Sequence, residues 1–97
     1  MSGGNWKDMF YACQRGDVEL VKYYIREGIN INYQHPEFLT SPLLECIRLN
    51  QLEVARYLLE NGADPYQKEG FGAENSFDLA KMKKNKEAIE LLKKHKK

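Results

Sequence analysis

Two stretches of the sequence repeat one pattern, and they decide the fold. "DVELVKYYIREG" runs from Asp17 to Gly28, and "QLEVARYLLENG" runs from Gln51 to Gly62. A shift of 34 residues superimposes them, so that nearly every apolar position meets an apolar one. "NKEAIELLKKHK", from Asn85 to Lys96, aligns under both. The chain is therefore predicted to consist of three copies of one unit.

Each unit is predicted to hold two helices. Within the aligned stretches, apolar residues recur at the i, i+3, i+4, i+7 spacing of one helix face. These stretches form the outer helix of each unit. An inner helix is predicted ahead of each one, over "MFYACQR" (Met9 to Arg15), "PLLECIRL" (Pro42 to Leu49) and "SFDLAKMK" (Ser76 to Lys83).

Single residues mark the ends of these helices. Gly16 and Asn50 stand between inner and outer helix, and Gly28 and Gly62 follow the outer helix. Glycine and asparagine tolerate the left-handed backbone that closes a helix C-terminus. Ser41-Pro42 supplies an N-cap followed by proline at the first helical position. The helix boundaries are therefore set by local chemistry.

Two long connections, residues 29–40 and 63–74, separate the units. They hold Asn, Pro, Gly and charged residues and show no helical period. Asn75-Ser76, after the second connection, is a weaker version of the Ser41-Pro42 start. Long ordered loops in a compact domain are usually functional. We therefore expect the functional surface to include these connections.

The two-helix unit and its period resemble the ankyrin-repeat family. "SPLLEC" (Ser41 to Cys46) is similar to the family's T-P-L-H-x-A motif, and "LLENGADP" (Leu58 to Pro65) to its L-L-x-x-G-A-D helix ending. "SFDLAKMKKNKEAIELLKK" (Ser76 to Lys94) resembles a terminal, capping repeat. The resemblance covers about residues 5–95. It implies an all-α solenoid of antiparallel helix pairs with hairpin-like connecting loops.

The resemblance also implies the boundaries of the repeats. Residues 1–4 are expected to be a flexible N-terminus, and residues 5–97 a single domain. The middle repeat would contact both neighbours, so Leu43 and Leu58 are expected in its core. The repeats are expected at about residues 5–32, 33–66 and 67–97, with the first and last acting as caps.

The sequence departs from the family pattern at three points. Each repeat spans 34 residues, and the one residue beyond the family's 33-residue norm lies in the connection. The family's histidine, which joins neighbouring repeats by hydrogen bonds, is replaced by Phe10, Leu44 and Asp78. Lys84 occupies the glycine position of the third unit, so this cap is expected to be strained or rearranged. Order between repeats is therefore expected to rest more on apolar packing.

The resemblance implies a module that binds another protein. Ankyrin arrays mostly bind partners through their loop fingers and the exposed face of their inner helices. A solenoid offers an extended concave surface and no deep enclosed pocket. The inner-helix residues expected on that face are Tyr11, Gln14, Glu45 and Arg48, with Leu79 and Lys83 in the third unit.

Four aromatic residues stand in the otherwise polar connections: Tyr33, Phe38, Tyr66 and Phe71. Two interpretations stay open, since the rings either pack back onto the inner helices or remain exposed as anchors for a partner. An exposed anchor carries about 2 kcal/mol or more. Phe38 and Phe71 lie nearest the loop tips and are the stronger anchor candidates. If they are anchors, replacing both with alanine weakens partner binding and leaves the helices intact.

Composition limits the alternatives. The 97 residues suffice for one small domain, and 42% hydrophobic with 30% charged residues is typical of a globular chain. No apolar run approaches the ~20 residues of a membrane span, and "MSGGNWKDMF" lacks a secretory pattern. Cys13 and Cys46 lie in apolar helical runs, which favours inert thiols in a reduced setting. A cytoplasmic or nuclear location is therefore expected.

Patterns for catalysis and metal binding are missing from the sequence. His35 and His95 have no patterned nucleophile or carboxylate partner, and His35 is expected to be a surface loop residue. No CxxC or HxxxH spacing and no phosphate-binding glycine loop occurs. We therefore expect no enzymatic activity, no cofactor and no metal.

Charge is uneven along the chain. Residues 81–97 carry an excess of six positive charges, and residues 1–80 an excess of five negative charges. Lysines at a helix C-terminus interact favourably with its dipole, which explains most of this tail. The alternative function is a basic C-terminal helix that binds nucleic acid or an anionic surface. We expect a protein partner rather than nucleic acid, and a monomer, although a homo-oligomer stays open.

Overall fold

The computed structural model describes residues 3–68, 70, 72 and 74–95, with the backbone alone for residues 3–5. These residues form six α-helices and no strand. The helices are α1 (Gly3–Arg15), α2 (Val18–Arg26), α3 (Pro42–Arg48), α4 (Leu52–Glu60), α5 (Ser76–Met82) and α6 (Lys86–Lys94). The first helix is longer than the expected Met9–Arg15 segment, because it begins at Gly3.

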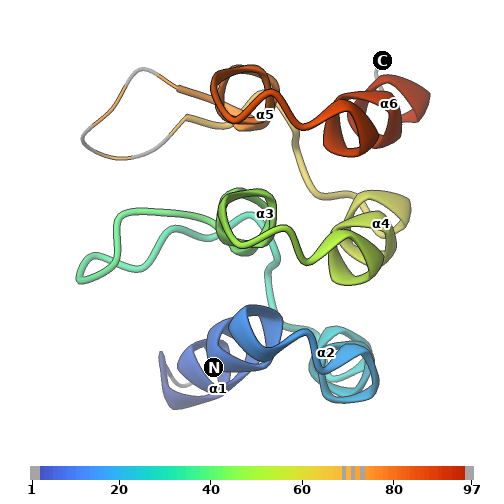
Figure 1. The fold of residues 1–97 in the computed structure, drawn as a ribbon. Coiled ribbons are helices and arrows are strands. Elements are labelled where there is room, and N and C mark those ends of the chain that lie inside the picture. The colour runs from blue at the N-terminus through green and yellow to red at the C-terminus, as the bar shows by residue number, and fades with distance from the viewer. Residues whose placement is uncertain (1–2, 69, 71, 73, 96–97) are drawn as a thin grey trace.

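The helices stack as three pairs in two layers (Figure 1). The inner layer contains α1, α3 and α5, and the outer layer contains α2, α4 and α6. Each helix contacts its partner in the pair and the equivalent helix of the next pair. The two connections leave the stack on the same side, beside the inner layer. The expected all-α solenoid is confirmed.

The helix starts are capped by side chains. Asp17 caps α2, Ser41 caps α3 and Asn85 caps α6, each by accepting a hydrogen bond from a backbone N–H of the first turn. Asn75 caps α5 in a reciprocal arrangement, since the Asp78 carboxylate in turn accepts from the Asn75 amide at 3.1 Å. The Asn75-Ser76 start is therefore stronger than its sequence suggested.

The turns between helices use left-handed backbone, as the sequence predicted. Gly16, Asn50 and Lys84 connect inner to outer helices with φ values of 75°, 60° and 53°. Gly28 and Gly62 follow the outer helices with φ values of 96° and 99°. Lys84 therefore keeps the geometry of its counterparts despite its side chain, at a cost of about 1–2 kcal/mol.

Replacing Gly62 with alanine is expected to destabilise the fold by about 1–2 kcal/mol, because alanine resists the left-handed backbone. No atom lies within 4 Å of the added Cβ, so the cost comes from the backbone alone. Urea unfolding followed by circular dichroism measures this change. Gly62→Asn is the matched variant, and it should lose less because asparagine tolerates positive φ. Wild-type stability in Gly62→Ala would contradict the left-handed backbone described at Gly62.

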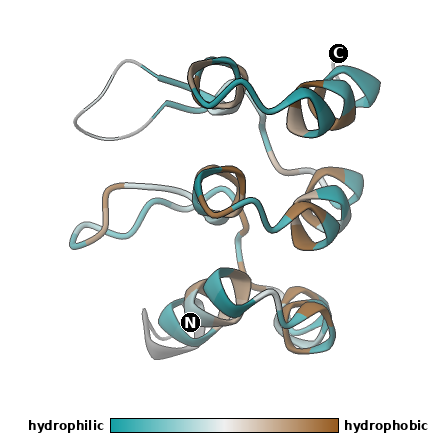
Figure 2. Cartoon of the chain, in the orientation of Figure 1, coloured by the Kyte–Doolittle hydropathy of each residue, from teal (hydrophilic) through white to brown (hydrophobic). Residues whose placement is uncertain are grey.

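The core lies between the layers and continues through all three pairs. Figure 2 shows the hydrophobic segments on the helices and mainly hydrophilic residues along the connections. Leu43 and Leu58, the expected core residues of the middle repeat, are 1% and 0% exposed. The other large side chains that are fully buried include Met9, Val21, Leu44, Ile47, Val54 and Leu92.

Polar side chains also join the repeats, which the sequence did not indicate. The Asn32 side chain donates to the Gly62 carbonyl at 3.0 Å and accepts from the Asp64 amide at 2.8 Å. Gln67 Nε2 donates back to the Asn32 carbonyl at 2.6 Å. The start of the first connection, at Asn32, and the start of the second, at Gly62 to Gln67, are therefore joined by reciprocal hydrogen bonds. These two segments are called the loop bases below. The expectation that order rests mainly on apolar packing was incomplete.

A second set of polar contacts joins the turns between inner and outer helices. Gln51 Nε2 donates to the Gln14 carbonyl at 2.8 Å, linking the first and second repeats. Asn85 Nδ2 donates to Asn50 Oδ1 at 2.7 Å, linking the second and third repeats. These amide side chains therefore join each turn to the neighbouring repeat.

Candidate binding surface

An aromatic cluster forms where the first connection folds back onto α1. The Trp6 ring is 3% exposed and stacks on Phe10, with ring centroids 5.0 Å apart. Phe38, from the connection, stacks on Phe10 at 5.0 Å and lies 5.7 Å from Trp6. The His35 ring lies 5.4 Å from both Trp6 and Phe38. Four rings, two from α1 and two from the first connection, thus form one packed aromatic cluster.

The structure decides between the two interpretations of Phe38 and corrects one expectation about this connection. Phe38 packs back onto the inner helix, because its half-buried ring lies against the apolar core through Trp6 and Phe10. His35 is not a surface residue, since its side chain is only 14% exposed. Its Nδ1 accepts a hydrogen bond from the Glu37 amide at 3.1 Å, which fixes the turn after it. Both rings hold the connection against α1.

The exposed rings of this cluster belong to two tyrosines. Tyr11 is 43% exposed and lies 6.1 Å from the Phe38 ring. Tyr33 is 44% exposed and meets Trp6 edge-on at 6.0 Å. The structure therefore brings together two predicted site residues, one from an inner helix and one from a loop. Both present a polar hydroxyl and an aromatic ring on a rigid base.

An ion pair closes one side of the cluster. Lys7 Nζ lies 2.6 Å from Glu37 Oε1 and 6.0 Å from the Phe38 ring centroid. The hydrogen bond and the charge of Lys7 lower the pKa of Glu37, and the same contact raises the pKa of Lys7. This contribution to stability is present above the ordinary pKa of a glutamate and is lost as pH falls through the lowered value. The pair is exposed, so its contribution is small.

A polar network occupies the middle of the inner-helix face. Glu45 accepts from Gln14 Nε2 at 2.8 Å and from Arg48 at 2.6 Å. Glu45 is 9% exposed and therefore lies beneath its two partners. The expectation that its carboxylate lines the open face was wrong. Gln14 and Arg48 are half-buried, and these two residues cover the carboxylate.

The second connection presents one tyrosine. Tyr66 is 44% exposed, and its ring stacks on Phe77 of α5 at 5.3 Å. Its backbone amide donates to Asp64 Oδ1 at 2.9 Å, so the turn holds the ring in place. Phe71, the other aromatic predicted here, lies outside the described residues. The second loop therefore repeats the first in one respect, an exposed tyrosine that packs on another aromatic ring.

Sequence reasoning missed two exposed apolar side chains near the ends of the inner helices. Leu49 is 45% exposed and Met82 is 66% exposed. Met82 stands 34 residues after Arg48 and 68 after Gln14, so the repeat places these three in equivalent positions. That comparison could have identified Met82 from the sequence. At this one position the inner-helix face is polar in the first two repeats and apolar in the third.

The two cysteines take no visible part in this surface. Cys13 and Cys46 are both unpaired and buried. Contact with Cys13 and burial raise the pKa of Cys46. A thiol held protonated is a poor nucleophile and a poor metal ligand. Among the described residues, no group of three or more His, Cys, Asp or Glu side chains is placed to hold a metal ion.

Comparison with known families agrees with the stack of helix pairs. The family model described as "Ankyrin repeats (3 copies)" matches residues 4–69. The chain belongs to the ankyrin-repeat family. Its repeats thus account for the paired helices, the glycine turns and the connections on one side of the stack.

The chain is similar in sequence to parts of three proteins whose names describe different kinds of protein. The human 2-5A-dependent ribonuclease is 34% identical over 64% of the chain. Palmitoyltransferase AKR1 of Lachancea kluyveri is 32% identical over 67%. The ankyrin repeat protein FPV031 of fowlpox virus is 28% identical over 87%. The chain spans only 8%, 8% and 25% of these relatives, so the names describe much longer proteins.

The described helices are short compared with a membrane span. The longest, α1, has 13 residues, and a span needs about 20 predominantly apolar residues. None of the helices in the described part of the chain combines the length and apolar character that crossing a bilayer needs.

Proposed function

We propose that this ankyrin-repeat chain is a non-catalytic module that binds a partner protein through its loop bases and inner-helix face. The observation that supports this most is the pair Tyr11 and Tyr33, whose exposed rings lie against the packed rings of Trp6 and Phe38. The module acts as a scaffold, an adaptor or an inhibitor. Ankyrin repeats generally mediate such protein–protein contacts.

The two tyrosines fit the role of anchors for a physical reason. A tyrosine contributes a large contact area and one hydroxyl while it loses little conformational freedom on binding. Trp6 and Phe38 already restrict these rings, so part of the ordering cost is met before the partner arrives. The half-exposed tyrosines are therefore better anchor candidates than Phe38, whose ring is already packed against the core.

The proposed surface extends from these anchors over the neighbouring repeats. Gln14 and Arg48 cover the middle of the inner face with polar groups. Tyr66 repeats the exposed ring on the second loop, and Phe71 remains a proposed contact outside the described residues. We further propose that the module works as a monomer in a reducing compartment, a proposal that the two buried, unpaired cysteines support.

Replacing Tyr11 and Tyr33 together with alanine is expected to weaken partner binding by at least about 2 kcal/mol, or roughly thirtyfold. Affinity capture from native extract, followed by titration of the captured partner, measures this loss. Circular dichroism should show unchanged helices, because both side chains are substantially exposed.

Tyr23→Ala is the matched control for this double variant. Tyr23 lies on the outer helix α2 and is 51% exposed, so its loss removes a similar ring from a different surface. Equal losses of binding from both surfaces would count against the proposal. Unchanged binding in the double variant would overturn it.

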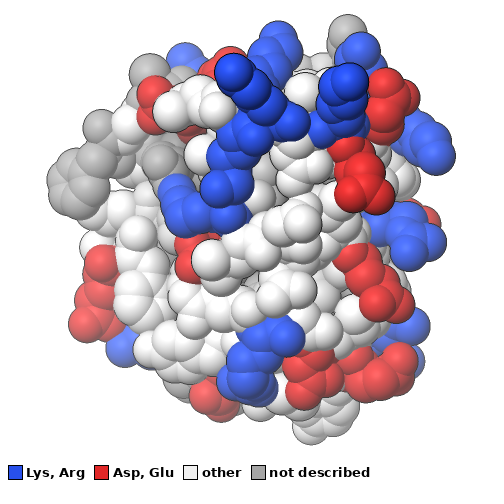
Figure 3. All heavy atoms as spheres, viewed as in Figure 1, with Lys and Arg blue, Asp and Glu red and all other residues white. Residues whose placement is uncertain are grey.

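A second candidate function is recognition of nucleic acid or another polyanion by the third repeat. Figure 3 shows Lys and Arg side chains gathered over the end of the stack formed by α5 and α6. Lys81, Lys83, Lys84 and Lys86 are all exposed, and none forms an ion pair with a described residue. Titration with duplex DNA at low salt tests it, since phosphate contacts are strongest there. Absence of binding at ~50 mM salt would reject this function.

A further inference from the structure

An open pocket of about 530 Å³ lies where the turn between α5 and α6 meets the turn between α3 and α4. Its lining is polar throughout, with three lysines, two asparagines and one glutamate: Lys83, Lys84, Lys86, Asn50, Asn85 and Glu87. The three lysines are exposed, and none forms an ion pair with a described residue. Three cations against one carboxylate make this pocket attractive to an anion.

The hydrogen bonds between the two turns leave one amide group free to donate. The Ala88 backbone N–H donates to Asn85 at 3.1 Å, so the accepting atom of Asn85 is its oxygen. Asn85 Nδ2 in turn donates to Asn50 at 2.7 Å, so Asn50 also accepts through its oxygen. Asn50 Nδ2 then has no acceptor among the described residues. The network thus orients an exposed donor at the pocket wall.

Two of the three lysines stand where the local structure disfavours them. The equivalent residues are Leu49, Asn50 and Leu52 in the second repeat and Arg15, Gly16 and Val18 in the first. Lys84 has a φ of 53°, a backbone that glycine and asparagine adopt at lower cost. Lys86 begins α6, and a cation is unfavourable at the positive end of a helix dipole. Helix formation therefore explains neither lysine.

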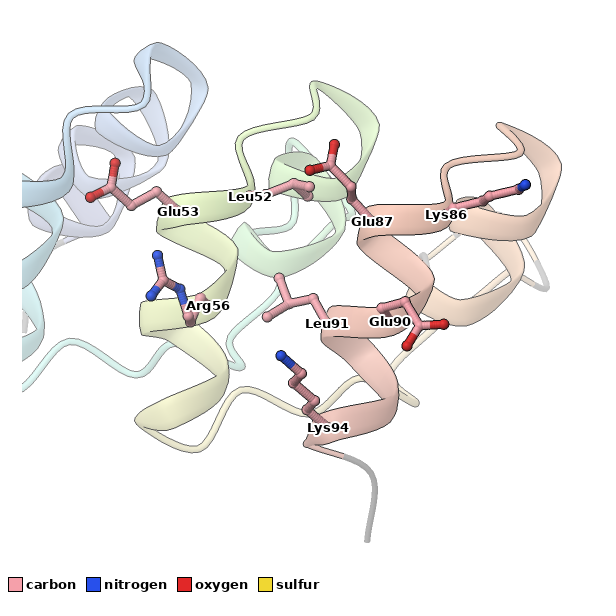
Figure 4. A pocket seen from close by; sticks show the side chains of 8 residues that line it. All are labelled: Leu52, Glu53, Arg56, Lys86, Glu87, Glu90, Leu91 and Lys94. Atoms are coloured by element: carbon pink, nitrogen blue, oxygen red, sulfur yellow. The ribbon is translucent and has the colours of Figure 1, made fainter.

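Nearby carboxylates limit the kind of anion that fits. Figure 4 shows Lys86 pointing away from α4, whereas Glu87 lies beside Leu52 of α4. An extended polyanion that crossed this turn would meet Glu87 and then Glu53, while one compact anion would avoid most of this repulsion. A phosphate monoester concentrates about −1.5 to −2 charges and three acceptor oxygens on one group. It can therefore meet two ammonium groups and an amide at once.

We propose that the turn between α5 and α6 binds a phosphate monoester carried by a phosphorylated side chain of a protein partner. The phosphate oxygens accept hydrogen bonds from the ammonium groups of Lys84 and Lys86 and from Asn50 Nδ2. Lys83 adds positive charge at the same pocket. The proposal rests on the proposed function as a protein-binding module and adds a chemical feature of the partner.

Nuclear magnetic resonance titration of the 97-residue chain with N-acetyl-phosphoserine amide tests the site at about 0.15 M salt. The backbone amide signals of Lys84 and Lys86 and the side-chain amide of Asn50 should shift saturably. A millimolar dissociation constant is expected because the charges are exposed. N-acetyl-serine amide, which lacks the phosphate, should give no saturable shift. A short DNA duplex at equal phosphate concentration should shift the same signals less.

Three variants separate a phosphate site from a general effect of charge. Lys86→Gln and Lys94→Gln each remove one cation from α6, at opposite ends of the helix. Lys86→Gln should weaken binding of N-acetyl-phosphoserine amide roughly two- to fivefold, and Lys94→Gln should leave it unchanged. Lys84→Asn should weaken binding by a similar factor and raise the urea midpoint of unfolding, because asparagine tolerates the left-handed backbone.

Three results would overturn the proposal. The first is the absence of a saturable shift with N-acetyl-phosphoserine amide. The second is an equal loss of affinity in Lys86→Gln and Lys94→Gln, which would reflect net charge alone. The third is tighter binding of the DNA duplex at this turn, which would assign it to nucleic acid. None of them bears on the tyrosine surface, since the Tyr11 and Tyr33 double variant should bind N-acetyl-phosphoserine amide with wild-type affinity.

Discussion

Replacing Leu58 with alanine is expected to destabilise the fold by about 2–5 kcal/mol. Leu58 lies in the middle repeat and is 0% exposed, so the shortened side chain leaves a cavity that the neighbouring helices cannot fill. A domain of this size has a total stability of only about 5–15 kcal/mol, and a smaller value is expected near its lower limit of length. Many molecules of the variant should therefore be unfolded at room temperature. Thermal and urea unfolding by circular dichroism measure the loss.

Leu49→Ala is the matched control for Leu58→Ala. Leu49 is 45% exposed, and the same truncation there should change stability by less than about 0.5 kcal/mol. Leu43→Ala, in the same repeat, should behave like Leu58→Ala because Leu43 is 1% exposed. A melting curve of Leu58→Ala that matches the wild type would contradict the packing of the middle repeat.

Replacing Trp6 with alanine is expected to cost about 3–5 kcal/mol and to release the first connection from α1. Trp6 contacts four rings, three of which come from the connection: Tyr33, His35 and Phe38. Loss of the indole therefore removes both core packing and the base of the exposed tyrosines. Urea unfolding measures the first effect, and partner titration the second.

Trp6→Phe separates loss of the ring from loss of the indole N–H. Trp6 Nε1 is buried and has no hydrogen-bond partner in the described residues. Phenylalanine keeps an aromatic ring and removes this unpaired donor, so Trp6→Phe should cost less than about 1.5 kcal/mol. If Trp6→Ala and Trp6→Phe are equally stable, the cluster does not hold the connection in the way described.

Local sequence signals predicted the helices and turns well. The glycines at 28 and 62 and the Ser41-Pro42 dipeptide have their effect within a few residues, so their meaning can be read without the rest of the fold. The 34-residue repeat added the stacking order, because equivalent helices of successive copies must lie side by side. Leu43 and Leu58 were identified as core residues in this way.

Contacts between distant segments were not predictable from these signals. Trp6 meets Phe38 only because the connection folds back, and no local pattern specifies that contact. The sequence therefore left open whether loop aromatics are buried or exposed, and the structure shows that Phe38 packs back onto α1. Glu45 became buried for a similar reason, since Gln14 approaches it from the neighbouring repeat.

Differences between equivalent positions of the repeats are a further signal in the sequence. Tyr57 and Leu91 are equivalent positions that differ in side chain, and they lie on the outer layer. Met82 is likewise the apolar counterpart of Arg48 and Gln14. In a repeat protein, the positions at which copies differ indicate which surfaces are specialised.

The central claim is that a partner protein binds at the exposed tyrosines beside the first loop. Photo-crosslinking in native extract tests it most directly, with a photoreactive amino acid in place of Tyr11, Tyr33 or Tyr23 in separate proteins. The account predicts the same discrete crosslinked partner from positions 11 and 33 and none of it from position 23. A partner that crosslinks from position 23 and from neither of the others would contradict it.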